Sequence, residues 1–330
     1  MGRIGLLANP ASGKDVRRLV ARASVFDNQE KRAIVRRVIV GALAAGGRNK
    51  IELLYHDDAH GICAQAIAEF GDNVCARAVD STQMGTALDT ISAARAMQDA
   101  ECEVVITLGG DGTNRAFCMG WGQAPLLPIS TGTNNVFPGL REATVAGAAA
   151  GLVASGKIGR EAFAQQKAIR VSIEGERDDL ALIDVLLIAE RFVGARALLR
   201  PDQFRSALLT RAEPAAVGIT SIGGLLHPID ARADNGLWIE FGAGTVLNAP
   251  IAPGLYAPVS VRQFQPLALG QTVRTQGPGT LAFDGERERS LKPDQEATLT
   301  LERNGPRVLD VGAVMHWAAE RGAFKLKENL

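Results

Sequence analysis

The segment Val104-Val105-Ile106-Thr107-Leu108-Gly109-Gly110-Asp111-Gly112-Thr113-Asn114 decides the fold of this chain. Its first part, residues 104–108, is a continuous run of largely apolar residues, which is typical of a strand buried in a parallel sheet. Glycines follow at once, and a helix is expected to begin near Thr113. A strand that ends in a glycine loop before a helix places that loop at the carboxyl end of the sheet. This is the edge at which open α/β sheets bind ligands.

The loop itself favours a bound phosphate group. The glycines Gly109, Gly110 and Gly112 let the backbone approach a ligand closely, so that successive N–H groups can surround phosphate oxygens. The helix that follows presents an N-terminus, which favours anions. Asp111 is the unusual member, because a carboxylate repels a phosphate unless it holds a metal or accepts a proton. The structural alternative is a tight turn in which Asp111 is the helix N-cap.

Neither of two common phosphate-binding motifs fits this chain. A dinucleotide fingerprint starting at Gly110 would need its third glycine where Arg115 stands. A P-loop ending at Lys14 would need a glycine in place of Ala8 and a serine or threonine in place of Asp15. The glycine loop therefore belongs to a different class of phosphate site.

Strands and helices alternate along the first half of the chain. Apolar runs predict strands at residues 3–8, 51–55, 74–79, 104–108 and 126–129. Helical spacing of apolar residues predicts helices at residues 29–45, 62–70, 84–97 and 143–154. This alternation predicts an α/β fold with a doubly wound parallel sheet, forming a domain over residues 1–160.

The second half has a different pattern. From Ala168 onward, short strand-like segments are separated by glycine and proline turns. One helical interruption is expected near residues 201–211, and a final helix at residues 314–321. We therefore predict a β-rich second domain over residues 161–330, whose last segment is a candidate to return to the first domain.

Two further polar loops follow predicted strands of the first half. One contains Asn9, Pro10, Ser12, Gly13 and Lys14, and the other contains Thr131, Gly132, Thr133 and Asn134. Each loop alone is ordinary turn chemistry. Because the carboxyl ends of parallel strands meet at one edge of a sheet, the two loops and the glycine loop are expected to form a single cleft.

These motifs together resemble the superfamily of NAD kinases and diacylglycerol/sphingosine kinases. Within it, the chain looks most similar to the ATP-NAD kinase or acetoin-catabolism X-type group. The shared motifs lie at residues 9–13, 109–113 and 132–134, with Phe283-Asp284-Gly285-Glu286 as a further match in the second half. The resemblance extends over nearly the whole chain. It implies a kinase that uses ATP and Mg²⁺, with residues 161–330 as the acceptor domain.

The resemblance also assigns roles to residues. Asp111 and then Asp284 are the candidate catalytic carboxylates that would activate an acceptor hydroxyl. The candidate nucleotide-binding residues are Asn9, Ser12, Gly13, Lys14, Gly109, Gly110, Gly112, Thr113, Thr131, Gly132, Thr133 and Asn134. Asp184 and Glu286 are the candidate acceptor-binding residues. The partners implied are a nucleoside triphosphate and a hydroxyl-bearing small molecule.

One departure from the NAD kinase pattern bears on the acceptor. Those enzymes carry an Asn-Glu pair that holds the dinucleotide, and the nearest match here is Ile183-Asp184. The amide is missing and the acid is shorter, which argues against NAD as the acceptor. Asp184 is then either an acceptor contact or a satisfied polar residue at a strand start. A lipid kinase and a non-catalytic nucleotide-binding regulatory protein remain the alternatives.

Composition limits other classes of function. Lys plus Arg and Asp plus Glu both total 36, so the zero net charge argues against a dedicated nucleic-acid binder. No apolar run is long enough for a secretory signal or a membrane span, so a cytoplasmic location is expected. The four cysteines are predicted to be free and buried. The sequence leaves homo-oligomer formation and the metal ligands open.

The segment from His56 to His60 has two interpretations. Two histidines four residues apart, with acids between them, resemble a metal cluster. The segment also falls at a predicted strand-to-helix turn, where Asp57 or Asp58 would cap the helix at residues 62–70. We favour the cap.

Overall fold

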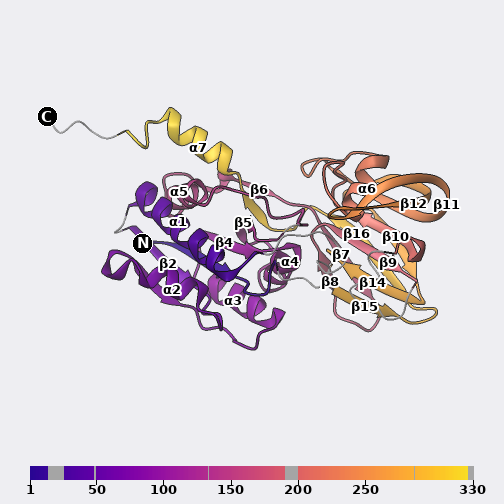
Figure 1. Cartoon of the computed structure of the whole chain (residues 1–330), viewed down its shortest axis with the longest axis horizontal. Helices are drawn as coiled ribbons and strands as arrows, with labels where there is room; N and C mark the ends of the chain where they lie inside the picture. The colour runs from indigo at the N-terminus through magenta and orange to yellow at the C-terminus, as the bar shows by residue number, and fades with distance from the viewer. Residues whose placement is uncertain (14–25, 48–49, 133, 190–199, 286, 326–330) are drawn as a thin grey trace.

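The computed structural model describes residues 1–13, 26–47, 50–132, 134–189, 200–285 and 287–325. Figure 1 shows the first half of the chain as an α/β part and the second half as a β-rich part beside it. Helix α7 (Val311–Glu320) lies at the end of the described chain and packs against the first part, where Val314 and Ala318 are buried in its core.

In the described part of the chain, seven strands form the first sheet, in the order β3-β2-β1-β4-β5-β17-β6. Their bounds are β1 (Gly2–Ala8), β2 (Ile51–Tyr55), β3 (Cys75–Ala78), β4 (Val104–Gly109), β5 (Pro125–Ser130), β6 (Phe163–Gln165) and β17 (Arg307–Leu309). All neighbouring pairs are parallel except β17 and β6, which are antiparallel.

Helices cover both faces of this sheet. On one face lie α1 (Asn28–Gly46), α2 (Ile62–Ala68), α5 (Ala143–Ala154) and α7, and on the other lie α3 (Ala87–Asp99) and α4 (Asp111–Gly120). Side chains of β4 alternate between the two cores, with Ile106 in the first and Val105 in the second. Helices α1 and α5 approach closely because Gly41 faces α5, where a Cβ atom would lie 1.9 Å from the Thr144 carbonyl oxygen.

The second half forms two antiparallel sheets within the described residues. The four-stranded sheet has the order β13-β16-β7-β8, with bounds β7 (Ala168–Ile173), β8 (Asp179–Ala181), β13 (Thr272–Gln276) and β16 (Glu296–Glu302). The six-stranded sheet has the order β12-β11-β10-β9-β14-β15, with bounds β9 (Asp184–Ile188), β10 (Phe204–Leu209), β11 (Asn235–Ala252), β12 (Leu255–Ala268), β14 (Gly279–Phe283) and β15 (Arg287–Leu291). A shared apolar core lies between the two sheets and includes Val171, Leu281 and Leu299. Helix α6 (Ile219–Leu226) packs on the six-stranded sheet through Ile222.

Short 3-10 turns complete the described structure at Gly71–Asn73, Arg160–Ala162 and Pro201–Gln203. None of the described helices is both long and apolar enough to cross a membrane.

The predicted fold class is confirmed: a parallel, doubly wound sheet comes first and an antiparallel β-rich half follows. The predicted helix at residues 143–154 coincides with α5. A domain boundary near residue 160 stays a prediction.

Two local predictions are wrong. The helical interruption near residues 201–211 is a single 3-10 turn followed by β10, because this segment pairs on both sides with β9 and β11. Of the four cysteines, all of which are free, Cys75 is exposed because it lies on β3 at the edge of the first sheet.

Candidate functional site

The candidate site lies at the carboxyl ends of β1, β4 and β5. These strands are neighbours in the first sheet, and the chain leaves β1 toward α1 on one face and leaves β4 toward α4 on the other. This divergence is the topological switch point at which α/β sheets form a ligand-binding crevice. The strand order thus places the glycine loop between the other two polar loops.

The three polar loops are in direct contact, and a cleft formed by them stays a prediction. The Asn9 Nδ2 atom donates to the Thr113 Oγ1 atom over 2.8 Å, which joins the first loop to α4. The hydroxyl groups of Ser12 and Thr131 are 2.7 Å apart, which joins the first loop to the loop after β5. The glycine loop also contacts the loop after β5, because a Cβ atom added at Gly110 would lie 2.8 Å from the Asn135 Oδ1 atom.

The start of α4 is arranged as an open helix N-terminus. Gly110 is the N-cap residue and supplies no side-chain acceptor to the first turn. The first N–H groups of a helix have no intrahelical partner, so this turn offers donors and a positive dipole end to an anion. The alternative in which Asp111 is the N-cap is wrong, because Asp111 is the first helical residue.

The Asp111 carboxylate instead holds the loop that follows β5. It accepts hydrogen bonds from the backbone N–H of Phe137 at 2.8 Å and of Val136 at 3.1 Å, and its residue is only 7% exposed. The candidate catalytic carboxylate therefore has a fixed position between the glycine loop and the third polar loop.

Asp284 is held in a similar way in the second half. It lies in the turn after β14 with a left-handed φ of 48°, and its carboxylate accepts from the backbone N–H of Leu182, Ile183 and Asp184. Burial raises the pKa of the Asp284 carboxyl, and these N–H donors together with the Arg115 cation oppose that rise. The turn thus brings Asp284 and the candidate acceptor residue Asp184 together at the start of β9.

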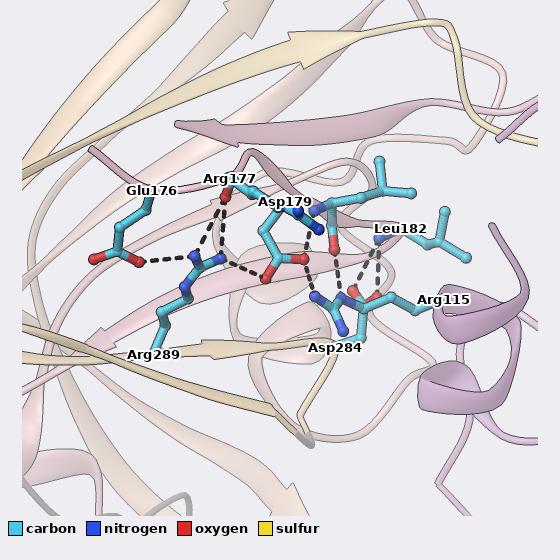
Figure 2. A network of polar contacts seen from close by, with 8 residues as sticks. Arg115, Glu176, Arg177, Asp179, Leu182, Asp284 and Arg289 are labelled. Carbon is cyan, nitrogen blue, oxygen red and sulfur yellow. Dashed lines mark hydrogen bonds and ion pairs between the residues drawn. The ribbon is translucent and has the colours of Figure 1, made fainter. Parts of the chain in front are cut away.

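Helix α4 is tied to the second half by the ion-pair network shown in Figure 2. Arg115 donates to the Asp179 carboxylate and to the Leu180 carbonyl oxygen, and its guanidinium lies 5.0 Å from the centre of the Phe283 ring. Arg289 completes the network on the outer side, 3.0 Å from the Asp179 Oδ2 atom. The helix that carries the glycine loop is therefore fixed against the strands that carry Asp284.

Lys31 is a site residue that the sequence analysis missed. Its side chain is fully buried, and its Nζ atom donates to the carbonyl oxygens of Asn9 and Ser12, each at 2.8 Å, and of Pro10 at 3.3 Å. These bonds turn the carbonyl groups of the first polar loop toward α1. The signal was a lysine at the start of the apolar stripe of a predicted helix, three residues before the buried Ile34.

Three of the predicted site residues cannot be placed, and two others lie in the polar loops themselves. Lys14, Thr133 and Glu286 lie outside the described residues. Asn134 is exposed. Gly13 packs closely against the third loop, because a Cβ atom added at Gly13 would lie only 2.6 Å from the Thr131 carbonyl oxygen.

The segment from His56 to His60 forms a turn in which Asp58 accepts from the first N–H of α2, as expected of a capping acid, although Gly61 is the N-cap residue. The Asp58 carboxylate accepts from the Ile62 N–H at 2.9 Å and from the His60 N–H at 2.8 Å. His56 is paired with the Ser81 hydroxyl group, and burial lowers the pKa of its imidazole. Across the residues that the structure describes, no group of three or more His, Cys, Asp or Glu side chains is arranged to hold a metal ion.

The fold is that of the NAD kinase and diacylglycerol kinase class. Residues 4–158 match the ATP-NAD kinase N-terminal domain family. The structure is similar to that of yeast NADH kinase complexed with NADH, with a TM-score of 0.55 and 12% identity over 100% of this chain and 90% of that one. It is also similar to a putative diacylglycerol kinase from Bacillus anthracis str. Sterne, with a TM-score of 0.52 and 13% identity over 93% of this chain and 97% of that one. At such identities these likenesses show the fold alone.

The second half identifies the family within this class. Residues 167–304 match the acetoin catabolism protein X C-terminal domain family. Acetoin catabolism protein X from Cupriavidus necator is 38% identical over 329 residues, which cover 96% of this chain and 92% of that protein. The chain belongs to the acetoin catabolism protein X family, and the predicted resemblance is confirmed.

Lys167, at the start of this second half, is predicted to make the stability of the protein depend on pH. Its side chain is 2% exposed, and its Nζ atom donates to the carbonyl oxygens of Asp230 at 3.1 Å and Asn235 at 2.5 Å. Burial, followed by the nearby cations Arg303 and Arg211, lowers the pKa of Lys167 to about 8.

Between pH 8 and the ordinary lysine pKa, the unfolded state therefore binds more protons than the folded state. The Lys167 contribution to stability should rise across this window, with a slope no steeper than about 1.4 kcal/mol per pH unit. Urea unfolding of the wild type and of Lys167→Met, measured from pH 7 to pH 10, isolates this contribution as a difference. Parallel curves for the two proteins would contradict the assignment.

Proposed function

We propose that the protein is an ATP-dependent phosphotransferase that transfers the γ-phosphoryl group of ATP to a hydroxyl group of a small metabolite or nucleotide-like acceptor. One observation carries the proposal: the uncapped N-terminus of α4 lies between two polar loops that contact it and each other. Kinase catalysis rests chiefly on positioning and charge stabilisation, which such a site supplies.

The phosphates of ATP are proposed to lie on the glycine loop. The first-turn N–H groups of α4 would donate to phosphate oxygens, and Asn9, Ser12, Thr113 and Thr131 supply polar groups around them. The interlocking hydrogen bonds of these four side chains fix the shape of the site before a ligand arrives. Lys14 and Thr133 stay predictions for the same site.

The transfer step is assigned to Asp111. Its carboxylate takes the proton of the acceptor hydroxyl, and the freed oxygen forms a bond to the γ-phosphorus. The bond from that phosphorus to the bridging oxygen breaks, and ADP leaves. Asp284 is the second candidate for the base, and its hydrogen bonds from the backbone of residues 182–184, which we assign to the acceptor region, support this choice.

Mg²⁺ is proposed to enter with the nucleotide. This ion is usually held by one or two carboxylates together with substrate phosphates and water, rather than by a cage of protein ligands. If Asp284 is the base, Asp111 is the carboxylate beside the glycine loop that would hold this ion; if Asp111 is the base, the ion would be held by the phosphates and water. When bound, the ion would neutralise negative charge on the phosphates.

ATP with Mg²⁺ at millimolar concentration should raise the melting temperature of the protein by mass action. The variant Gly110→Ala should reduce this rise in melting temperature, because its Cβ atom would meet the Asn135 side chain in the loop after β5. Gly122→Ala, just beyond α4, is the matched control, since its Cβ atom would lie in ordinary contact at 3.9 Å from the Cys118 carbonyl oxygen. If no nucleoside triphosphate, pyrophosphate or polyphosphate shifts the melt, the phosphate site is wrongly assigned.

Transfer itself is tested with labelled ATP and a panel of hydroxylated metabolites, diacylglycerol and NAD. We expect label on a small acceptor and little on NAD, because the buried Ile183 side chain supplies no amide for the dinucleotide. Label on diacylglycerol would indicate a lipid kinase. Nucleotide binding without any transfer would indicate a regulatory protein.

A further inference from the structure

Arg211, which plays no part in the transfer step described above, is a buried cation with incomplete pairing. It follows β10 and is 8% exposed. Its Nη2 atom donates to the Gln166 Oε1 atom over 3.1 Å, and its Nη1 atom is 3.7 Å from the Glu213 carboxylate. The Nε atom has no hydrogen-bond partner among the described residues. A guanidinium carries five N–H donors, and a buried charge is costly unless it is paired.

A second buried polar atom without a partner lies nearby in the chain. The Thr220 hydroxyl group, in the first turn of α6, is 1% exposed and unpaired within the described residues. Glu213 connects the two positions, because its backbone N–H donates to the Thr220 carbonyl oxygen over 3.2 Å and its carboxylate faces Arg211. Buried polar side chains without a protein partner are rare in folded proteins, and ordered water or a bound ion or ligand can complete their hydrogen bonds.

The carboxylates around Arg211 include its ion-pair partner Glu213 and both candidate bases of the site. Burial lowers the pKa of the Arg211 guanidinium, and the carboxylates of Glu213, Asp111, Asp230 and Asp284 oppose this by favouring the charged form. Arg211 therefore lies within electrostatic reach of both carboxylates that are candidates for the base. A cation in this position would offset the charge of a negative ligand beside them.

The strand pairing places Arg211 on the acceptor side of that site. Leu209 pairs with Asp184 across β10 and β9, and the Thr210 N–H donates to the Ile183 carbonyl oxygen over 2.8 Å. Asp184 in turn accepts from the backbone N–H of Asp284. Arg211 is thus fixed by the strands that carry the candidate acceptor residues, whereas the donor phosphates are assigned to the loops of the first sheet.

We propose that Arg211 binds an oxyanion of the acceptor, so that the substrate class is a hydroxyl compound that also carries a carboxylate or a phosphate group. The assignment of this ligand as the phosphoryl acceptor rests on the proposed kinase function, but the binding of an oxyanion by Arg211 does not require transfer. The planar fork of a guanidinium matches the geometry of both anions. Neutral polyols and neutral lipids would leave the Nε–H group without an anionic partner.

Binding is tested first without nucleotide. The full chain is titrated with glycerate, glycerol phosphate and glycerol while its melting temperature is followed. We expect the two anions to stabilise the wild type and glycerol to have no effect. Arg211→Met should weaken anion binding by about tenfold to a hundredfold, and Arg211→Lys by less. Arg205→Met is the matched control, because Arg205 is an exposed arginine on the preceding strand.

Further measurements separate the possible outcomes. If Arg211→Met does not fold, Arg211→Lys is compared with the wild type by the ratio of carboxylate to phosphate binding, which a merely structural cation would leave unchanged. If Arg211→Met binds both anions like the wild type, the proposal is wrong. If it loses ADP binding instead, the oxyanion belongs to the donor and the acceptor assignment is overturned. If anion binding depends on Arg211 but no transfer is detected, only the kinase function fails.

Discussion

Replacement of Arg115 by methionine should lower the free energy of unfolding by about 3–5 kcal/mol, as expected when one partner of a buried ion pair is removed. Arg115 and Asp179 are 3% and 5% exposed, so neither is solvated by bulk water in the folded protein. Without the guanidinium, Asp179 would keep Arg289 as a partner, but the Leu180 carbonyl group would lose its donor. Denaturant unfolding followed by circular dichroism measures the loss.

Arg170→Met provides the comparison for this prediction. Arg170 forms ion pairs with Glu302 at 3.0 Å and Asp178 at 3.7 Å, but its side chain is 47% exposed. Exposed pairs of this kind contribute about 1 kcal/mol or less, so this variant should unfold close to the wild type. Equal unfolding midpoints for the two variants would show that the Arg115 network does not fix α4 to the second half.

The first half of the fold follows from local sequence because each element there carries its own signal. The strands of a parallel sheet are buried on both faces, so they appear as short apolar runs such as residues 104–108. The helices between them show regular apolar spacing, and α5 was predicted at its observed bounds. Local pattern and tertiary burial agree in this half.

The β-rich half was harder to predict because its longest hairpin contains residues that usually interrupt strands. Strand β11 passes through Gly242 and Gly244, where the register with β12 shifts. Strand β12 contains Pro258 and Pro266, yet it is the edge strand of its sheet, where a missing N–H group leaves no ladder bond unmade. Only the order of strands in the sheet reveals that these prolines are tolerated.

The residues of the candidate site also fall into a predictable and an unpredictable group. The glycine loop was predictable because a strand, a loop and a helix N-terminus are consecutive in the chain. Residues that act through distant contacts were not: Arg115 and Asp179 are 64 residues apart, and Lys31 binds carbonyl groups around 20 residues before it. Arg211 has no local motif at all. Only the folded structure shows that its Nε atom is buried without a hydrogen-bond partner among the described residues.

The two candidate carboxylates differ in what holds them, and this difference separates their expected roles. Asp111 accepts from two backbone N–H groups and lies at the glycine loop, whereas Asp284 accepts from three and supports residues 182–184. An asparagine at either position keeps one oxygen acceptor but places an amide where the second oxygen was. Asp284→Asn should therefore lower the melting temperature and raise the acceptor KM, because it disturbs the backbone beside Asp184.

Asp111→Asn should instead leave the melting temperature nearly unchanged and reduce kcat by about a hundred- to ten-thousand-fold, the usual range for loss of a general base. Its remaining oxygen can still accept from the Phe137 N–H, so the loop after β5 keeps its main contact. Because a negative charge is removed beside the proposed phosphate site, ADP should bind at least as tightly as to the wild type. The measurements are kcat and KM with the best acceptor of the panel, ADP binding and the melting temperature. Normal turnover by Asp111→Asn, with turnover lost in a folded Asp284→Asn, would move the base to Asp284. A severe fall in the melting temperature of Asp111→Asn would make its carboxylate structural, since an acid needed only for proton transfer can be neutralised without loss of the fold.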